Sequence, residues 1–96
     1  MLLPREVELM EHALGIDQAF EKKGYHYKRH GVLYVKSYRN YFQTRGNKDT
    51  YNRWLDLESQ GLAEMWTEND YPYFAVTDEG IEQLQEQQKY VIRFIE

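Results

Sequence analysis

Apolar residues recur at helical spacing near the start of the chain. Val7, Met10 and Leu14 follow one another at steps of three and four residues, which places them on one side of a helix. Pro4 suits the first turn of a helix because its fixed φ is already helical and its missing N–H has no partner there. The pattern predicts a helix over residues 4–14.

The next stretch is less regular. Residues 17–23 are predicted to form a short turn of helix or a loop. Residues 32–35 are of the type that strands prefer, but Gly31 interrupts the segment that contains them. Residues 25–36 therefore suit either an ordered strand or a mobile loop, and the pattern leaves both open.

Two helices are predicted in the middle of the chain. Ser37 is a suitable cap for a helix over residues 38–44, and either Asn47 or Asp49 is a suitable cap for a helix over residues 50–60. A short turn that contains a glycine separates them. Two short helices joined in this way are typical of the helix-turn-helix arrangement.

A hairpin and a last helix are predicted after these. Residues 62–66 and 73–76 are β-type runs separated by a polar stretch rich in turn formers. Thr77 is a good cap for a helix that begins there or at the next residue. Apolar residues then follow a helical stripe: Ile81, Leu84, Val91 and Ile95.

Together these elements predict an α+β, winged helix-turn-helix-like fold in a single domain over residues 1–96. It has three N-terminal helices, a two-stranded hairpin as the wing and a C-terminal helix. The apolar end, residues 90–95, is expected to pack on the core or to pair two chains as a homodimer through the C-terminal helix. The predicted core comprises Val7, Met10, Leu14, Phe42, Trp54, Leu55, Leu62, Phe74, Val76, Ile81 and Leu84.

Composition excludes several classes of protein. The 96 residues contain no cysteine, which excludes a disulfide scaffold, a thiolate zinc site and a cysteine nucleophile. No apolar run approaches the roughly 18 residues of a membrane span, and the first residues do not form a signal peptide. We therefore expect a cytoplasmic protein without a membrane partner.

The charge is unevenly distributed along the chain. Residues 22–53 carry nine basic side chains against Asp49 alone, a net charge of +8. Residues 1–21 carry one base against five acids, a net charge of −4, and residues 54–96 carry two bases against ten acids, a net charge of −8. The basic segment either offers a surface to a polyanion or folds against the acidic ends and neutralises itself.

The basic segment is also rich in aromatic residues, a composition suited to phosphate contact and base stacking. By contrast, the predicted third helix carries Asp56 and Glu58, and the predicted wing carries Glu68 and Asp70, so both would repel phosphate. The predicted nucleic-acid-binding residues are therefore Lys28, Arg29, Lys36, Tyr38, Arg39, Tyr41, Arg45, Lys48 and Arg53. The alternative is that the tyrosines belong to the core and the cations solvate a loop.

Four short tracts carry a resemblance to known proteins. The endings Gly61-Leu62 and Val76-Thr77-Asp78-Glu79-Gly80 are similar to those of many bacterial winged-helix proteins. Together with His12-Ala13-Leu14-Gly15 and Tyr38-Arg39-Asn40-Tyr41-Phe42, they resemble a group of small phage and prophage proteins. The resemblance covers most of the chain apart from residues 16–36. It implies a winged-helix fold and, for a phage-encoded protein, the host cytoplasm.

The residues favour binding over catalysis. His26 and His30 are four apart but have no third ligand at a recognisable spacing, and neither serine lies in a nucleophile motif. No cofactor or metal is expected, and we expect a non-enzymatic phage-type accessory protein that associates with DNA in gene regulation or genome handling. The alternative is a phage protein that acts by protein contact, as an inhibitor of a host defence enzyme in the manner of an anti-CRISPR protein, or in particle assembly.

Overall fold

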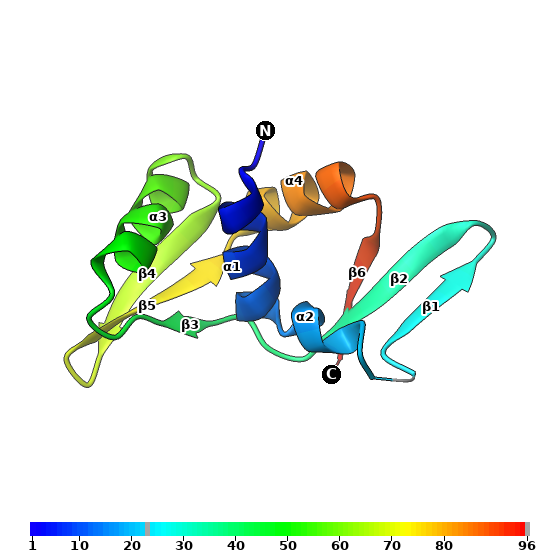
Figure 1. The fold of residues 1–96 in the computed structure, drawn as a ribbon, viewed down its shortest axis with the longest axis horizontal. Coiled ribbons are helices and arrows are strands. Elements are labelled where there is room, and N and C mark those ends of the chain that lie inside the picture. The colour runs from blue at the N-terminus through cyan, green and yellow to red at the C-terminus, as the bar shows by residue number, and fades with distance from the viewer. Residues whose placement is uncertain (23, 96) are drawn as a thin grey trace.

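Two small sheets lie toward opposite ends of the molecule, with helices between them and alongside one of them (Figure 1). The computed structural model describes residues 1–22 and 24–95. These residues form an α+β fold whose extents are 43 × 27 × 20 Å. Its helices are α1 (Pro4–Leu14), α2 (Ile16–Ala19), α3 (Lys48–Ser59) and α4 (Asp78–Gln88), and its strands are β1 (His26–Arg29), β2 (Val32–Ser37), β3 (Phe42–Gln43), β4 (Ala63–Glu68), β5 (Tyr71–Val76) and β6 (Val91–Phe94).

The two sheets differ in how their strands pair. In the first sheet, of order β1-β2-β6, β1 and β2 form an antiparallel hairpin and β6 joins β2 in parallel. In the second sheet, of order β3-β5-β4, both pairs are antiparallel. Figure 1 shows the β1–β2 hairpin at one end of the long axis and α3 with β4 and β5 at the other.

The core is built mainly from the helices and the inner faces of the sheets. Trp54 of α3 stacks on Phe74 of β5 with ring centroids 5.4 Å apart, and both side chains are fully buried. Of the predicted core, eight residues are buried, and three are half-buried against it: Phe42, Leu55 and Ile81. The predicted core is thus confirmed in its main members.

Local sequence signals predicted the starts of three helices to within two residues, and they predicted the β4–β5 hairpin. Helix α1 has the predicted bounds, with Pro4 in its first turn. Asn47 caps α3 by accepting from the Thr50 N–H, and Thr77 caps α4 by accepting from the Gly80 N–H. The β4–β5 hairpin turns on Asn69 and Asp70, both with positive φ, as tight two-residue turns require.

The helix predicted over residues 38–44 is wrong. Residues 38–41 form no helix, and the next two form β3, which pairs with β5. Ser37 does not cap a helix, because its hydroxyl donates to the carbonyl of Leu14 at 2.7 Å. Contacts with distant parts of the chain therefore override the local helical tendency of this segment.

The C-terminal stripe is also not helical to its end. Helix α4 stops at Gln88, Lys89 takes a left-handed φ of 61°, and the chain continues as β6. Val91 and Ile95 are therefore not part of the helix. Tyr90 and Ile92 are buried within this chain, so part of the apolar end covers its own core.

The segment over residues 25–36, left open between strand and loop, is the β1–β2 hairpin. The short helical turn expected after α1 is present as α2, although it starts one residue earlier than predicted and ends before residue 23. Within residues 1–22 and 24–95, no helix has the length and apolar character needed to cross a membrane.

Candidate nucleic-acid interface

The nine predicted binding residues fall into three groups in the structure. Lys28, Arg29 and Lys36 lie on the β1–β2 hairpin at one end of the molecule. A second group, Tyr38, Arg39 and Tyr41, lies in the segment that joins the two sheets. Arg45, Lys48 and Arg53 lie between β3 and the middle of α3, at the other end. The nine residues therefore do not form a single surface.

The first sheet gathers cations and tyrosines on one face. Because side chains alternate along a strand, the face opposite the buried Val35 and Ile92 is set by the pairing of the three strands. We call it the tyrosine face. Its members are Tyr27, Arg29, Val32, Tyr34, Lys36, Val91 and Arg93.

The tyrosine face contains an ordered stack. Tyr27 and Tyr34 are direct partners across β1 and β2, and their rings are nearly parallel with centroids 5.1 Å apart. On the β6 side, the Arg93 guanidinium lies 5.3 Å from the Tyr34 ring centroid. Tyr27 belongs to the edge strand and is 41% exposed, so the ring face turned away from Tyr34 has no strand beside it.

A shallow hollow continues this surface. It has a volume of about 470 Å³ and is lined by Tyr25, Lys36, Arg93, Phe94 and Ile95. Lys22 lies 5.7 Å from the Tyr25 ring centroid and adds a further cation beside it. The hollow therefore combines aromatic surface with positive charge, next to the C-terminal ends of β2 and β6.

The charges of the tyrosine face are not neutralised by ion pairs. Within the described part of the chain, the ion pairs are Arg5–Glu8 and His12–Asp17, and neither involves a cation of the basic segment. None of the described residues of the tyrosine face is acidic. Of the two alternatives for the basic segment, neither holds for all of it: the cations on the first sheet lack ion pairs, whereas Arg39 is bonded to the His12 carbonyl and Lys48 lines a hollow with Asp70.

Arg93 is not among the nine predicted binding residues, because the apolar stripe predicts a helix over its segment. It lies far from the basic segment in the chain, within a stretch that is acidic overall. The parallel pairing of β6 with β2 places it directly opposite Lys36. The signal that was available is the short β-type run Val91-Ile92-Arg93-Phe94, in which a single charge interrupts apolar residues.

Arg39 and Tyr38 hold the end of α1 in place. The Arg39 guanidinium donates to the His12 carbonyl at 2.7 and 3.2 Å, where a cation complements the negative end of the helix. The Tyr38 ring lies against Gly15, where a Cβ would approach it within 2.5–3.0 Å. These two predicted binding residues therefore have a clear structural role.

The contacts of Tyr38 and Arg39 with the end of α1 join two of the tracts that carry the resemblance. In the tract over residues 12–15, Ala13 accepts from the Tyr41 N–H at 3.1 Å, and the His12 ring meets Phe42 edge-on at 5.5 Å. Residues 12–15 and 37–42 thus pack on each other residue by residue. The role of these tracts in the structure is to pack α1 against the segment that joins the two sheets.

Two of the cations at the other end have polar or acidic neighbours. Arg45 donates to the Gln43 side chain at 3.0 Å and lies 5.7 Å from the Tyr71 ring centroid. Lys48 and Asp70 line one hollow together. Of the acids predicted to weaken phosphate binding, Asp70 therefore lies near one of these cations.

Among the described residues, two titratable groups with shifted pKa values form one partly buried contact. The Tyr90 hydroxyl donates to the Glu11 carboxylate at 2.9 Å. Burial raises the pKa of Glu11, although the hydrogen bond from Tyr90 opposes the shift. Burial and the adjacent Glu11 also raise the pKa of Tyr90. The pair ties the residue immediately before β6 to α1.

The two histidines considered as a metal pair do not lie on a helix. His26 belongs to β1 and its Nδ1 contacts the Ala19 carbonyl at 2.7 Å, while His30 lies in the turn after β1 with a φ of 52°. In the part of the chain that the structure describes, no group of three or more His, Cys, Asp or Glu side chains is arranged to hold a metal ion.

Comparison with known proteins gives no family for this chain. No protein-family model matches it, and neither the curated proteins nor the solved structures contain a match.

Proposed function

We propose that the chain is a non-enzymatic accessory protein that associates with DNA through the tyrosine face. The observation that carries the proposal is the strand alternation that places Arg29, Lys36 and Arg93 beside the stacked Tyr27 and Tyr34. Cations contact phosphates, and an aromatic ring offers a surface on which a base stacks. This is the combination found in proteins that bind nucleic acid without reading its sequence.

The geometry favours a single strand over a duplex. The exposed ring of Tyr27 can extend its stack only with a base whose face is free, and the bases of a duplex are already stacked on one another. Duplex readers instead place a helix in the major groove. In this chain α3 carries Asp56 and Glu58, which disfavour that position.

The winged-helix interpretation is kept for part of the chain as a proposal. Its support is the order α1, β3, α3, β4 and β5, with the strands arranged β3-β5-β4. The residues expected to form its second helix instead form the short strand β3 and irregular chain on either side of it. In this interpretation the first sheet is an addition to the winged-helix unit and supplies the binding surface.

The resemblance to phage and prophage proteins is likewise part of the proposal. For a phage-encoded protein, the proposed location is the cytoplasm of the host cell. The proposed role in gene regulation or genome handling rests on the tyrosine face and not on the resemblance. The tracts that carry this resemblance lie in packing contacts, so they suggest a shared fold and not a shared binding surface.

The test is the anisotropy of a fluorescein-labelled oligothymidylate of about 20 nucleotides, titrated with protein at several salt concentrations. Binding should weaken with salt, with a slope of log K against log salt near about −2, because each of three cations contributes roughly −0.7 for a single strand. An unlabelled duplex of the same length should compete poorly.

Two kinds of variant separate charge from stacking. Lys36→Gln should lower both the affinity and the salt slope, whereas Tyr27→Leu should lower the affinity about tenfold and leave the slope unchanged. Lys48→Gln makes the same charge change at the other end of the molecule and should have little effect. Absence of binding at low salt, or equal effects of Lys36→Gln and Lys48→Gln, would rule out the tyrosine face as the site.

A second candidate function, protein contact, is favoured by a separate observation. Exposed aromatic residues also gather on the second sheet, where Tyr41 is 50% and Trp66 38% exposed. Tyr and Trp are frequent anchors of protein interfaces. As a phage protein acting by contact, the chain would inhibit a host defence enzyme or take part in particle assembly.

A further inference from the structure

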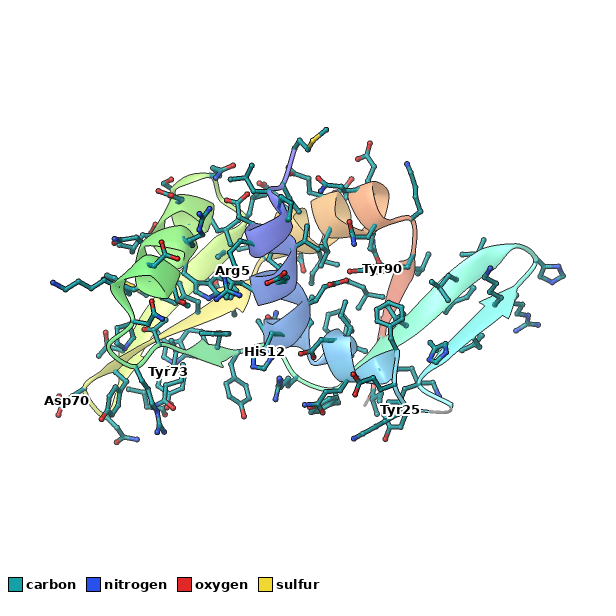
Figure 2. The ribbon with its side chains drawn as sticks, in the orientation of Figure 1. Arg5, His12, Tyr25, Asp70, Tyr73 and Tyr90 are labelled. Atoms are coloured by element: carbon teal, nitrogen blue, oxygen red, sulfur yellow. The ribbon has the colours of Figure 1, made fainter. Side chains whose placement is uncertain are left out.

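The second sheet has an outward face of its own. The pairing of β4 with β5 places Trp66 directly opposite Tyr73, on the side of the sheet away from the buried Phe74. The two rings stack with centroids 5.5 Å apart and an interplanar angle of 16°. Tyr41 precedes β3 beside this face. Figure 2 shows Tyr73 and Asp70 toward the end of the molecule that is opposite Tyr25.

A hollow with a volume of about 490 Å³ lies on this face. It is lined by Asn40, Tyr41, Trp66, Glu68 and Tyr73. Three of the lining side chains are aromatic, one is a carboxylate, one is an amide, and none is basic. We call this hollow the aromatic hollow.

The walls of the aromatic hollow are held by specific bonds. The Asn40 side chain donates to the Val76 carbonyl and accepts from the Val76 N–H, both at 2.8 Å, so it extends the ladder of β5. The Tyr41 N–H donates to the Ala13 carbonyl at 3.1 Å. The backbone that carries Tyr41 is therefore tied to both β5 and α1, which sets the position of this residue without any ligand.

The chemistry of these walls selects a cation. The face of an aromatic ring attracts positive charge, and several rings around one hollow with a carboxylate are the arrangement that recognises ammonium and guanidinium groups. An anion would be repelled by Glu68. Arg39, which does not line the hollow, already lies 5.9 Å from the Tyr41 ring centroid, so this ring accepts a guanidinium within the chain itself.

We propose that the aromatic hollow binds a lysine or arginine side chain of a protein partner. The charge around it favours a basic partner, because the adjacent hairpin also carries Glu64 and Asp70. Of the cations beside this hairpin, Arg45 is already placed against Tyr71, and Lys48 lines a different hollow with Asp70. The site is separate from the tyrosine face and does not depend on DNA binding.

The test uses a short peptide, acetyl-Gly-Arg-Gly-amide, and its citrulline analogue, which has nearly the same shape without the charge. Binding is followed by the indole N–H resonances of the two tryptophans. Trp66 is 38% exposed and lines the hollow, whereas Trp54 is fully buried and serves as an internal reference. The arginine peptide should shift the Trp66 resonance, leave that of Trp54 in place, and bind about tenfold more tightly than the citrulline peptide.

Two matched variants test the role of the carboxylate. Glu68→Gln should weaken binding of the arginine peptide several-fold and leave binding of the citrulline peptide unchanged. Glu64→Gln removes a carboxylate from the same strand and the same face but outside the hollow, so it should weaken the arginine peptide much less than Glu68→Gln does and leave the citrulline peptide unchanged. Retained Trp54 and methyl chemical shifts will show that each variant is folded.

Three outcomes would overturn the proposal: equal affinity for the two peptides, an equal loss in Glu64→Gln and Glu68→Gln, or no shift of the Trp66 resonance at millimolar peptide. Oligonucleotide binding by Glu68→Gln should equal that of the unmodified chain. If the arginine peptide does not bind but the oligonucleotide does, only the aromatic hollow is rejected as a site. If the peptide binds but the oligonucleotide does not, only the proposed function is rejected.

Discussion

Single residues explain why the tract that ends in Gly80 has its particular sequence. The Thr77 N–H donates to the Leu62 carbonyl at 3.1 Å, and the Thr77 hydroxyl donates to the Gly61 carbonyl at 2.7 Å. The same hydroxyl accepts from the Gly80 N–H. Thr77 thus joins the start of α4 to the turn after α3. The role of the tract is to hold these two segments together.

Replacement of Gly80 by alanine is expected to destabilise the protein by about 3 kcal/mol. Its Cβ would collide with the Leu62 carbonyl and would lie 2.7 Å from a Val76 methyl group. The greater helix propensity of alanine, about 1 kcal/mol, offsets only part of this cost. Urea unfolding measures the difference. Glu82→Ala, at an exposed position of the same helix, should stay within about 0.5 kcal/mol of the parent chain, and equal stability of the two variants would contradict the packing described.

At the level of elements, the C-terminal residues show how a strand replaces the expected last turns of a helix. β6 pairs with β2, and the Ile92 N–H donates to the Gln85 side chain at 2.8 Å. Alternation along the strand buries Ile92, while Ile95 beyond its end is 45% exposed. A helical continuation would instead have placed Val91 and Ile95 in the core.

The two arrangements predict opposite effects of truncating these isoleucines. In the β6 arrangement, Ile92→Ala should lower the free energy of unfolding by about 3 kcal/mol, because it leaves a cavity beneath the first sheet. Ile95→Ala should cost less than about 1 kcal/mol. Chemical denaturation of both variants tests this. A larger loss in Ile95→Ala than in Ile92→Ala would favour the helical stripe.

At the scale of the whole molecule, the two sheets differ in charge and lie apart. The first sheet exposes cations with tyrosines, and the second exposes carboxylates with tyrosines and a tryptophan. The net charge of −4 conceals this division. Because screening limits each charge to roughly 8 Å at physiological salt, the two faces act independently along an axis of 43 Å.

This separation predicts that the two sites bind without coupling. Saturation with oligothymidylate should leave the tryptophan emission unchanged, because Trp54 is buried and Trp66 lies on the second sheet. It should also leave the affinity for the arginine peptide unchanged. Quenching of the emission that saturates with oligonucleotide would place the nucleic acid on the second sheet instead of the tyrosine face.

Much of the fold was determined locally and was therefore predictable from sequence. Helix α1, the caps Asn47 and Thr77 and the β4–β5 hairpin depend on residues within a few positions of one another. Hydrophobic spacing also identified most of the core. For the candidate site, sequence identified Arg29 and Lys36 on the tyrosine face, because charge and aromatic content are visible in composition.

Only the tertiary structure decided the rest. The non-helical conformation of residues 38–43 depends on contacts with α1 and β5, and the tyrosine face depends on β6, which joins β2 from more than fifty positions away along the chain. Local propensity contains no information on such pairing, because its free energy comes from hydrogen bonds and burial made with a distant strand. Sequence determined which side chains carry charge and aromatic area, and the pairing of the strands decided which of them share a surface.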